Sequence, residues 1–207
     1  MKRLKIVVMG LVLIGFFGFS QLEASANASD MHNGSTGQNV NNLQSTLKKM
    51  GYFHTGVTGY YGPITETAVT KFQRDFGIPA TGYTGPLTRG MIEKVHRMAR
   101  VVHGEARGES YTGQVAVAAV ILNRVDSPHF PNTISNVIFQ RNAFTAVNDG
   151  QYWLTPNASA YRAVKDAMLG WDPSSGATYY YNPAHVSDNW IFSRTVIKQI
   201  GKHHFAY

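Results

Sequence analysis

The segment Val115–Leu122 constrains the fold of this chain more than any other. It reads Val-Ala-Val-Ala-Ala-Val-Ile-Leu, without a single polar side chain, inside a longer helical pattern from Thr112 to Val125. A helix that is apolar on every side must be buried on every side. The sequence therefore predicts that this helix lies inside a hydrophobic core.

One carboxylate stands just before this helix. Glu105 lies where the helical pattern of Val95–Val102 gives way to a turn containing Gly108. A carboxyl group at the edge of a dry core has a raised pKa and can donate a proton near neutral pH. Glu105 is therefore a candidate general acid, although its spacing alone fits an exposed carboxylate at a helix end equally well.

The first residues have the organisation of an export signal. Basic residues are followed by the apolar run Ile6–Phe19 and by small residues that suit cleavage after Ala26 or Ala28. Residues 1–26 are predicted to be a secretory signal peptide. The run is short and broken by glycines, which argues against a membrane anchor. The protein is expected to be exported across the cytoplasmic membrane.

The composition narrows the choice of partners. The 207-residue chain has a formal net charge of +7 and no cysteine. Its basic residues are scattered, in runs no longer than that at Lys48–Lys49, so no nucleic-acid partner is expected. A basic exported protein is instead attracted to acidic envelope polymers. Without disulfides, its stability must come from packed cores.

A short helix opens the folded part of the chain. Residues 27–37 are small and polar and are predicted to form a disordered leader. The apolar positions that follow have helical spacing, and Gly51 ends the pattern. These positions are Val40, Leu43, Leu47 and Met50.

An internal repeat comes next. The segment Thr58–Thr65 returns as Thr81–Thr88, and each copy places a proline directly after a glycine turn, where a helix can begin. Together with the first helix, the two copies predict a small three-helix bundle over residues 38–95. The side chains expected to be buried are Ile64, Ala68, Phe72, Phe76, Leu87, Met91 and Val95.

The second unit, residues 96–207, combines helices with short strands. Beyond the apolar helix, helical patterns cover 133–139 and 156–168. Strand patterns follow at 177–181, 195–200 and 203–207. Helices first and strands later indicate an α+β domain. Because Met91–Val102 fits one helix, the two units are expected to be joined with almost no linker, in a mainly α protein of two domains.

The first unit resembles a known family. The duplicated Gly-x-x-Gly-Pro-x-Thr turn and the segment Ala68–Ile78 are similar to the peptidoglycan-binding domain of bacterial wall hydrolases. This family often carries Asp where Thr58 and Thr81 stand, so the resemblance predicts the fold more firmly than the glycan contacts. The alternative is a bundle that serves only as a spacer.

The second unit resembles the catalytic domain of spore cortex-lytic enzymes, which are germination-type cell-wall hydrolases. The resemblance rests on an ordered set of motifs and implies a lysozyme-like α+β fold with one essential glutamate in a glycan groove. That glutamate is Glu105. The motifs are His103–Glu109, Ala118–Arg124, Asn142–Ala146, Gly170–Pro173, Gly176–Pro183 and Ile200–Phe205.

The resemblance also implies a reaction. It is a lytic transglycosylation at the bond between N-acetylmuramic acid and N-acetylglucosamine, in which an internal hydroxyl replaces water and no second carboxylate is needed. Glu109, four residues on, is either a second acid or a cap of the next helix, and the cap is the favoured interpretation. If water were the nucleophile, Glu109 and Asp149 would be the candidates for a second acid.

Further residues are expected to bind the glycan. Aromatic rings stack on sugar faces, and amides can hold N-acetyl groups. The predicted substrate-binding residues are Phe144, Thr145, Tyr180, Asn182 and Trp190. Family position favours the first four of these residues, and aromatic character favours Trp190.

Two other functions stay open. A zinc-dependent peptidoglycan amidase or peptidase would use ligands among His103, Glu105, His185, His203 and His204, but no His-Glu-x-x-His spacing is present. A non-catalytic wall-binding protein is the other. No metal or cofactor is expected, and the protein is expected to be a monomer in the cell wall or at the spore cortex and inner-membrane periphery. The sequence does not reveal whether an inhibitory partner protein exists.

Overall fold

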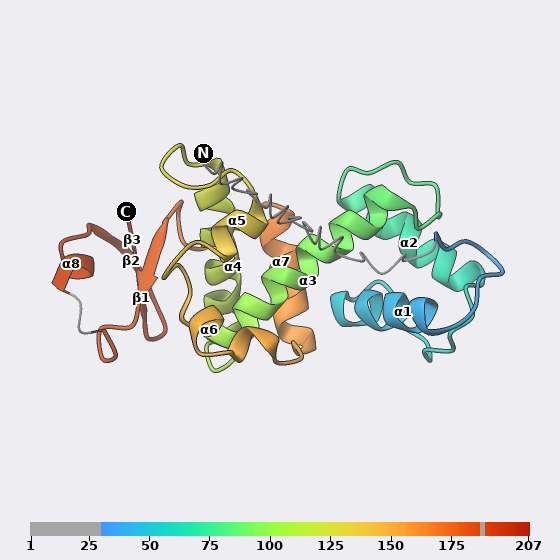
Figure 1. The fold of residues 1–207 in the computed structure, drawn as a ribbon, viewed down its shortest axis with the longest axis horizontal. Helices are drawn as coiled ribbons and strands as arrows, with labels where there is room; N and C mark the ends of the chain where they lie inside the picture. The colour runs from blue at the N-terminus through green and yellow to red at the C-terminus, as the bar shows by residue number, and fades with distance from the viewer. Residues whose placement is uncertain (1–29, 187–188) are drawn as a thin grey trace, which may run out of the picture.

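The structure is a computed structural model that describes residues 30–186 and 189–207. It is elongated, with helices α1 and α2 at one end, a small sheet at the other and α3 running between them (Figure 1). The predicted mainly α architecture, a helical bundle followed by an α+β unit, is confirmed. The predicted signal peptide lies outside the described residues. Within them, no helix has the length and apolar character needed to cross a bilayer.

The first unit contains α1 (Gln38–Met50), α2 (Pro63–Asp75) and the first half of α3 (Pro86–Ala106). Helix α1 ends at Gly51 in the left-handed conformation, with φ of 86°, as its glycine stop predicts. Helices α2 and α3 both begin with the proline of the repeated turn. Two of the predicted secondary-structure signals, the glycine stop and the proline start, are therefore confirmed.

The buried faces of α2 and α3 differ from the prediction at the first expected position of each helix. Ile64 and Leu87 are 58% and 68% exposed, so their expected place in the core was wrong. The next residue in each copy, Thr65 or Thr88, is buried instead. Each threonine hydroxyl accepts a hydrogen bond from a buried glutamine. A polar pair thus takes the position that hydrophobic periodicity assigned to an apolar side chain.

The first of these glutamines, Gln44, holds the first repeated turn. Its Oε1 accepts hydrogen bonds from the N–H groups of Thr58 and Gly59, both at 3.0 Å. Its Nε2 donates to the Tyr60 carbonyl at 2.8 Å and to Thr65 Oγ1 at 2.9 Å. Every hydrogen-bonding position of this buried amide is therefore occupied.

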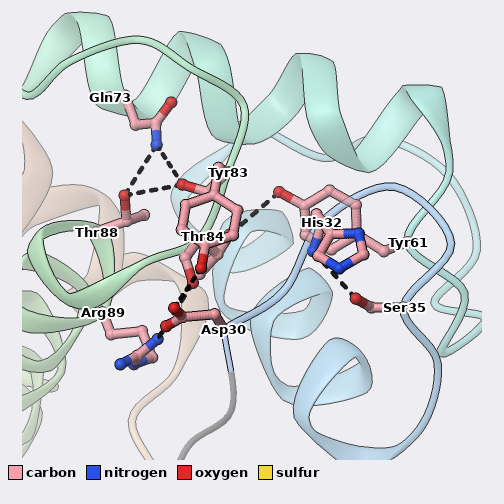
Figure 2. Close-up of polar contacts among 9 residues, drawn as sticks. All are labelled: Asp30, His32, Ser35, Tyr61, Gln73, Tyr83, Thr84, Thr88 and Arg89. Atoms are coloured by element: carbon pink, nitrogen blue, oxygen red, sulfur yellow. Dashed lines mark hydrogen bonds and ion pairs between the residues drawn. The ribbon is translucent and has the colours of Figure 1, made fainter.

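The second copy repeats the arrangement around Gln73 (Figure 2). Oε1 of Gln73 accepts from the Gly82 N–H at 2.8 Å, and Nε2 donates to the Tyr83 carbonyl and to Thr88 Oγ1, both at 2.8 Å. We call each glutamine with the turn that it holds a glutamine clamp. The internal repeat is thus a repeat of hydrogen bonding as well as of sequence.

The segment 27–37 was predicted to be disordered, but the part that the structure describes is ordered from residue 30. Met31 is buried and pairs with Thr84, with backbone N–O distances of 3.2 and 2.8 Å. Asp30 forms an ion pair with Arg89 at the start of α3 (Figure 2). These contacts are long-range, which explains why local composition did not reveal them.

The second unit is built around the apolar helix α4 (Tyr111–Asp126), as predicted. It packs against α3, α5 and α7, and its residues from Val115 to Ile121 are at most 2% exposed. Ser110 caps it, because the Ser110 hydroxyl accepts from the Gly113 N–H at 3.2 Å. The other helical segments are α5 (Ile134–Ile138), α6 (Thr145–Asn148), the 3-10 turn η1 (Gln151–Trp153), α7 (Ala158–Met168) and α8 (Asn189–Phe192).

The sheet is antiparallel, with strand order β1-β3-β2. The three strands lie where the sequence predicts them: β1 (Tyr179–Tyr181), β2 (Val196–Ile200) and β3 (His203–Ala206). Tyr180 is paired with Phe205, and the Tyr180 ring also contacts His203 on the same face. Tyr179 and Tyr181 therefore point to the opposite face.

No loop separates the two units. Helix α3 has 21 residues and passes through the boundary expected at residue 95. Helix α1 also packs against α7, where Tyr161 is only 1% exposed. The Tyr161 hydroxyl is hydrogen-bonded to His96, and Lys49 lies 5.1 Å from the Tyr161 ring centroid. The first unit is thus packed directly on the helical part of the second unit.

Candidate active site

Glu105 is the next-to-last residue of α3 and lies at the edge of the hydrophobic core. Its Oε1 accepts a hydrogen bond from the Ala146 N–H at 2.6 Å, and its carboxylate is also hydrogen-bonded to Tyr180. Ala146 belongs to α6 and Tyr180 to β1, so three elements far apart in sequence meet at this carboxyl group.

A glycine makes the approach of α6 geometrically feasible. A Cβ atom at Gly104 would lie 2.4 Å from the Ala146 Cβ, far inside van der Waals contact. Gly104 therefore lets α6 pack directly on the last turn of α3, which places the Ala146 N–H on Glu105. An isolated glycine inside a helical pattern is a known sign of such a close approach.

The surroundings of Glu105 raise its pKa. Burial is the largest cause, because it penalises the charged carboxylate, and the nearby charge of Asp149 adds to it. The hydrogen bonds from Ala146 and Tyr180 and the positive charge of Arg124 oppose this rise without cancelling it. Glu105 therefore keeps its proton to a higher pH than an exposed glutamate does.

Tyr180 remains a proton donor under all ordinary conditions. Burial and the adjacent charge of Glu105 raise the pKa of its hydroxyl far above the usual value. Behind it, Arg124 donates from Nε to the Thr178 carbonyl at 2.7 Å and from Nη1 to the Ala143 carbonyl at 3.3 Å. Arg124 thereby ties the start of β1 to the loop that leads into α6.

Glu105 opens onto a cleft of about 380 Å³. Glu109 lies in the same cleft, and its Oε2 accepts from the Lys202 N–H at 3.3 Å. The favoured interpretation of Glu109 as a helix cap was wrong, because Ser110 provides the cap. The cleft is lined by Gly104, Glu105, Arg107, Gly108, Glu109, Asn182, His185, Lys202 and His203.

Comparison with known proteins identifies the family. A spore cortex-lytic enzyme from Bacillus cereus is 39% identical over an alignment of 257 positions that covers 99% of each chain. This chain belongs to the spore cortex-lytic enzyme family. The alignment is longer than the 207 residues of this chain, so the Bacillus cereus relative contains segments without a counterpart here. A second family member, from Oceanobacillus iheyensis, is 61% identical over 112 residues, which are 54% of this chain and 41% of that protein.

The two units match separate family models and solved structures. A cell wall hydrolase model matches residues 108–206, and a peptidoglycan binding domain model matches residues 36–92. The crystal structure of the catalytic domain of the Bacillus cereus SleB protein is 59% identical, with a TM-score of 0.53, over 55% of this chain and 89% of that one. The catalytic domain of the germination-specific lytic transglycosylase SleB from Bacillus anthracis has the same identity and TM-score and is covered to 93%.

The residues predicted to bind substrate do not all gather at the Glu105 cleft. Tyr180 and Asn182 are at the Glu105 cleft, and Thr145 is exposed directly before Ala146. Trp190 stands apart, 5.5 Å from the Tyr179 ring.

Phe144 is placed differently from the expectation. It is 2% exposed, and the Arg124 guanidinium lies 4.9 Å from its ring. The ring therefore packs in the core beneath the start of α6. A direct contact with a sugar would require the ring to leave the core. Phe144 was expected at the glycan because of its family position, whereas its burial indicates core packing, the commoner role of such a ring.

Three residues at the site were not foreseen: Gly104, Arg124 and Ala146. The first two carry a local signal, since a glycine inside a helix and an arginine on an apolar helix both break the expected pattern. Ala146 carries none, because it contributes its backbone N–H.

The geometry gives little support to a zinc site. Within residues 30–186 and 189–207, no group of three or more His, Cys, Asp or Glu side chains is arranged to hold a metal ion. His203 contacts the ring of Tyr180, whereas His204 contacts that of Tyr181, so the two histidines point to opposite faces of β3. They cannot ligate one ion together without rearrangement of the strand.

Proposed function

We propose that this member of the family cleaves peptidoglycan glycan strands by lytic transglycosylation between N-acetylmuramic acid and N-acetylglucosamine. The observation that carries the proposal is a single carboxyl group, Glu105, that has a raised pKa and opens onto a cleft. The solved SleB catalytic domain from Bacillus anthracis is described as a germination-specific lytic transglycosylase, and it is 59% identical to the 55% of this chain that it matches. Glu105 is the proposed acid and base.

In the proposed reaction, Glu105 gives up one proton and later takes one back. Protonated Glu105 donates to the oxygen that bridges the two sugars, and the bond from that oxygen to C1 of the muramic residue breaks. The C6 hydroxyl of the same muramic residue then attacks C1, and Glu105 takes the proton of this hydroxyl. The products are a new non-reducing end and a 1,6-anhydromuramic end, and Glu105 is protonated again.

The other carboxylates near Glu105 fit this scheme better than hydrolysis. Glu109 is bonded to the backbone of the β2–β3 turn at Lys202. Asp149 accepts from the backbone and side chain of Gln151 at 3.0 and 2.6 Å, and these bonds lower its pKa. A carboxylate held in this way is less free to activate a water molecule, which the internal hydroxyl makes unnecessary.

The binding unit and the predicted signal peptide suggest where the enzyme acts. We infer that residues 38–95 hold the enzyme on peptidoglycan after export. The family name points to the spore cortex as the substrate. The proposed location is the cell wall, or the spore cortex and the periphery of the inner membrane. The direct packing of α1 on α7 then keeps the catalytic cleft at a fixed orientation to the bound wall.

Mass spectrometry of released fragments tests the reaction. Purified cortex and vegetative peptidoglycan are digested with the chain from residue 27 onward, and soluble fragments are analysed. We expect 1,6-anhydromuramic ends. Reducing muramic or glucosamine ends would mean that water is the nucleophile, and would return Glu109 and Asp149 as candidate second acids. Cut peptides on intact glycan would contradict the proposal and favour the amidase alternative.

A further inference from the structure

A second cavity lies at the other end of β1 from the catalytic cleft. It has a volume of about 570 Å³, within the range of about 300–1,000 Å³ that is usual for ligand sites. The cavity is formed between the end of α4, the loop that follows it and the start of β1. The residues that carry the argument are Asp126, Phe130, Tyr179 and Arg194.

The wall of this cavity offers aromatic rings. Phe130 and Tyr179 are 5.7 Å apart between ring centroids, and both are only half-buried. Tyr179 is also in contact with Trp190, whose side chain is 49% exposed. Half-buried aromatic rings that line a cavity can stack on the C–H faces of a sugar.

Among the described residues, stacking and not side-chain hydrogen bonding holds Arg194 in place. Its guanidinium carbon lies 5.1 Å from the Tyr179 ring and 4.3 Å from the Trp190 ring. Its Nε is shielded from solvent, and no described residue accepts a hydrogen bond from it. Arg124, by contrast, donates to two backbone carbonyls. Arg194 is therefore pre-oriented with donors still to be used.

Asp126 has no evident structural purpose. It is the last residue of α4, where a negative charge opposes the helix dipole and costs stability. It is exposed, and within the described part of the chain it forms neither a hydrogen bond nor an ion pair through its side chain. A carboxylate kept at an unfavourable position beside a cavity is a candidate for ligand binding.

The pairing of charges suggests a neutral ligand rich in hydroxyl groups. A sugar hydroxyl can donate to the Asp126 carboxylate, and a sugar hydroxyl or N-acetyl oxygen can accept from Arg194. An anion would be repelled by Asp126 and a cation by Arg194. An N-acetylated sugar uses both groups and the aromatic wall as well.

Strand β1 lies between this cavity and the catalytic cleft and is an edge strand of the sheet. Tyr179 lines the cavity from one face, whereas Tyr180, which is hydrogen-bonded to Glu105, and Asn182, which lines the cleft, belong to the other face. A glycan strand that reaches both sites therefore passes around the outer edge of β1. The chain from Tyr179 to Asn182 covers about 10 Å, a length comparable to one disaccharide. Arg124 lies between the two sites, 5.8 Å from the Tyr179 ring, and its charge acts on Glu105.

We propose that the cavity at Asp126, Phe130, Tyr179 and Arg194 is a distal sugar subsite that binds the same glycan strand that Glu105 cleaves. This inference rests on the proposed function, because it takes the strand as the ligand. It predicts that long strands are bound at both ends of β1 and that the shortest cleavable oligosaccharides reach only the catalytic cleft.

Steady-state cleavage of soluble, peptide-free glycan strands of graded length tests the subsite. Asp126→Asn removes the charge and keeps the size of the side chain, and Arg194→Gln removes the charge and leaves a shorter polar side chain. We expect each to lower kcat/KM for long strands about tenfold, the loss of one charge-assisted hydrogen bond, and to leave the shortest cleavable oligosaccharide unchanged. Arg162→Gln, an exposed arginine on α7, is the matched control and should change neither.

Three outcomes would overturn the proposal. Wild-type kcat/KM on long strands would show that the cavity does not bind the strand, and an equal loss on all lengths would show that these residues act on the catalytic site or the fold. If only insoluble peptidoglycan were affected, the cavity would bind a neighbouring strand and the same-strand proposal would be wrong.

Failure of the proposed function is recognised separately. Binding of long strands is also measured with Glu105→Gln as the parent protein, by calorimetry. If the wild-type chain cleaves no glycan, weaker binding after Asp126→Asn would still support the cavity as a sugar site. Unchanged binding would reject it, whichever reaction the enzyme performs.

Discussion

The binding unit and the catalytic unit both bury a polar side chain against backbone N–H groups, with opposite consequences. In the binding unit, the Gln44 and Gln73 side chains use their donors and acceptors within the protein. In the catalytic unit, Glu105 has bonds to Ala146 and Tyr180 and still lines a cleft. A buried polar group with all its bonds made holds a shape, whereas one left partly open can exchange a proton.

The largest expected effect is that of Glu105→Gln. It turns the open carboxyl into an amide like that of the clamps, which has no proton to give. We expect glycan cleavage to fall by about 10²–10⁴-fold, the usual contribution of a general acid, while binding to insoluble peptidoglycan is unchanged. Fragment release and co-sedimentation measure the two. Glu93→Gln, on an exposed face of the same helix, should retain full activity.

The same variant has a predicted effect on stability. Folding raises the pKa of Glu105, so its contribution to stability is complete below the pKa of the unfolded chain and is lost as the pH rises through the folded-state pKa. At neutral pH the glutamine avoids this loss. Chemical denaturation should therefore show Glu105→Gln to gain stability relative to wild type as the pH rises from acid to neutral. An unchanged difference across this range would contradict the raised pKa.

Gly104→Ala tests whether catalysis needs the close approach of α6 to Glu105. The added Cβ would clash with Ala146 and push α6, with its N–H, away from the carboxyl. We expect kcat to fall about 10- to 100-fold, with wall binding intact, as for a small displacement at a catalytic group. Gly90→Ala is the control: Gly90 lies on the same helix, and a Cβ atom there would meet nothing within 4 Å. Equal activity of the two variants would refute this role of Gly104.

Gln73→Ala tests the other side of the comparison. It leaves the Gly82 N–H and the Tyr83 carbonyl without their buried partner, which should cost about 2–4 kcal/mol in the free energy of unfolding. Residual folded protein should cleave soluble strands normally. Urea denaturation provides the measurement, and the exposed Gln38→Ala is the control. A loss below about 0.5 kcal/mol would mean that the clamp contributes little.

Tyr180→Phe is expected to have the smallest effect. Its hydroxyl lowers the pKa of Glu105, so its removal should raise that pKa further. Because the acid must be protonated, the alkaline limb of kcat/KM should move to higher pH. Tyr181→Phe, on the opposite face of β1, should leave the profile where it is. A shift to lower pH would show that Tyr180 does not stabilise the carboxylate.

Local patterns in the sequence predicted much of the fold and part of the site. The apolar run Val115–Leu122, the glycine stop at Gly51 and the three strands all follow from spacing and turn chemistry. The position of Glu105 between a helix end and the core made it a candidate, and the family resemblance singled it out. The part that sequence could not reveal depends on long-range contacts, as with the ordered segment at Met31 and the Ala146 N–H.

Errors occurred where a polar side chain was satisfied by a distant partner. Ile64 was expected in the core because apolar residues usually are, but Gln44 makes Thr65 the better buried residue. The opposite error placed Phe144 at the glycan, although Arg124 and the core cover it. Periodicity records local preference and contains no information about such pairs.

Direct titration of Glu105 tests the central claim most closely. The carboxyl carbon is followed by NMR in protein with ¹³C-labelled glutamate, and the Glu105 signal is assigned by its absence from Glu105→Gln. The account predicts a pKa above the ordinary glutamate value in wild type, and a still higher pKa in Tyr180→Phe. A pKa at or below the ordinary value would mean that Glu105 is an ionised carboxylate like any exposed one, and would contradict its role as the acid.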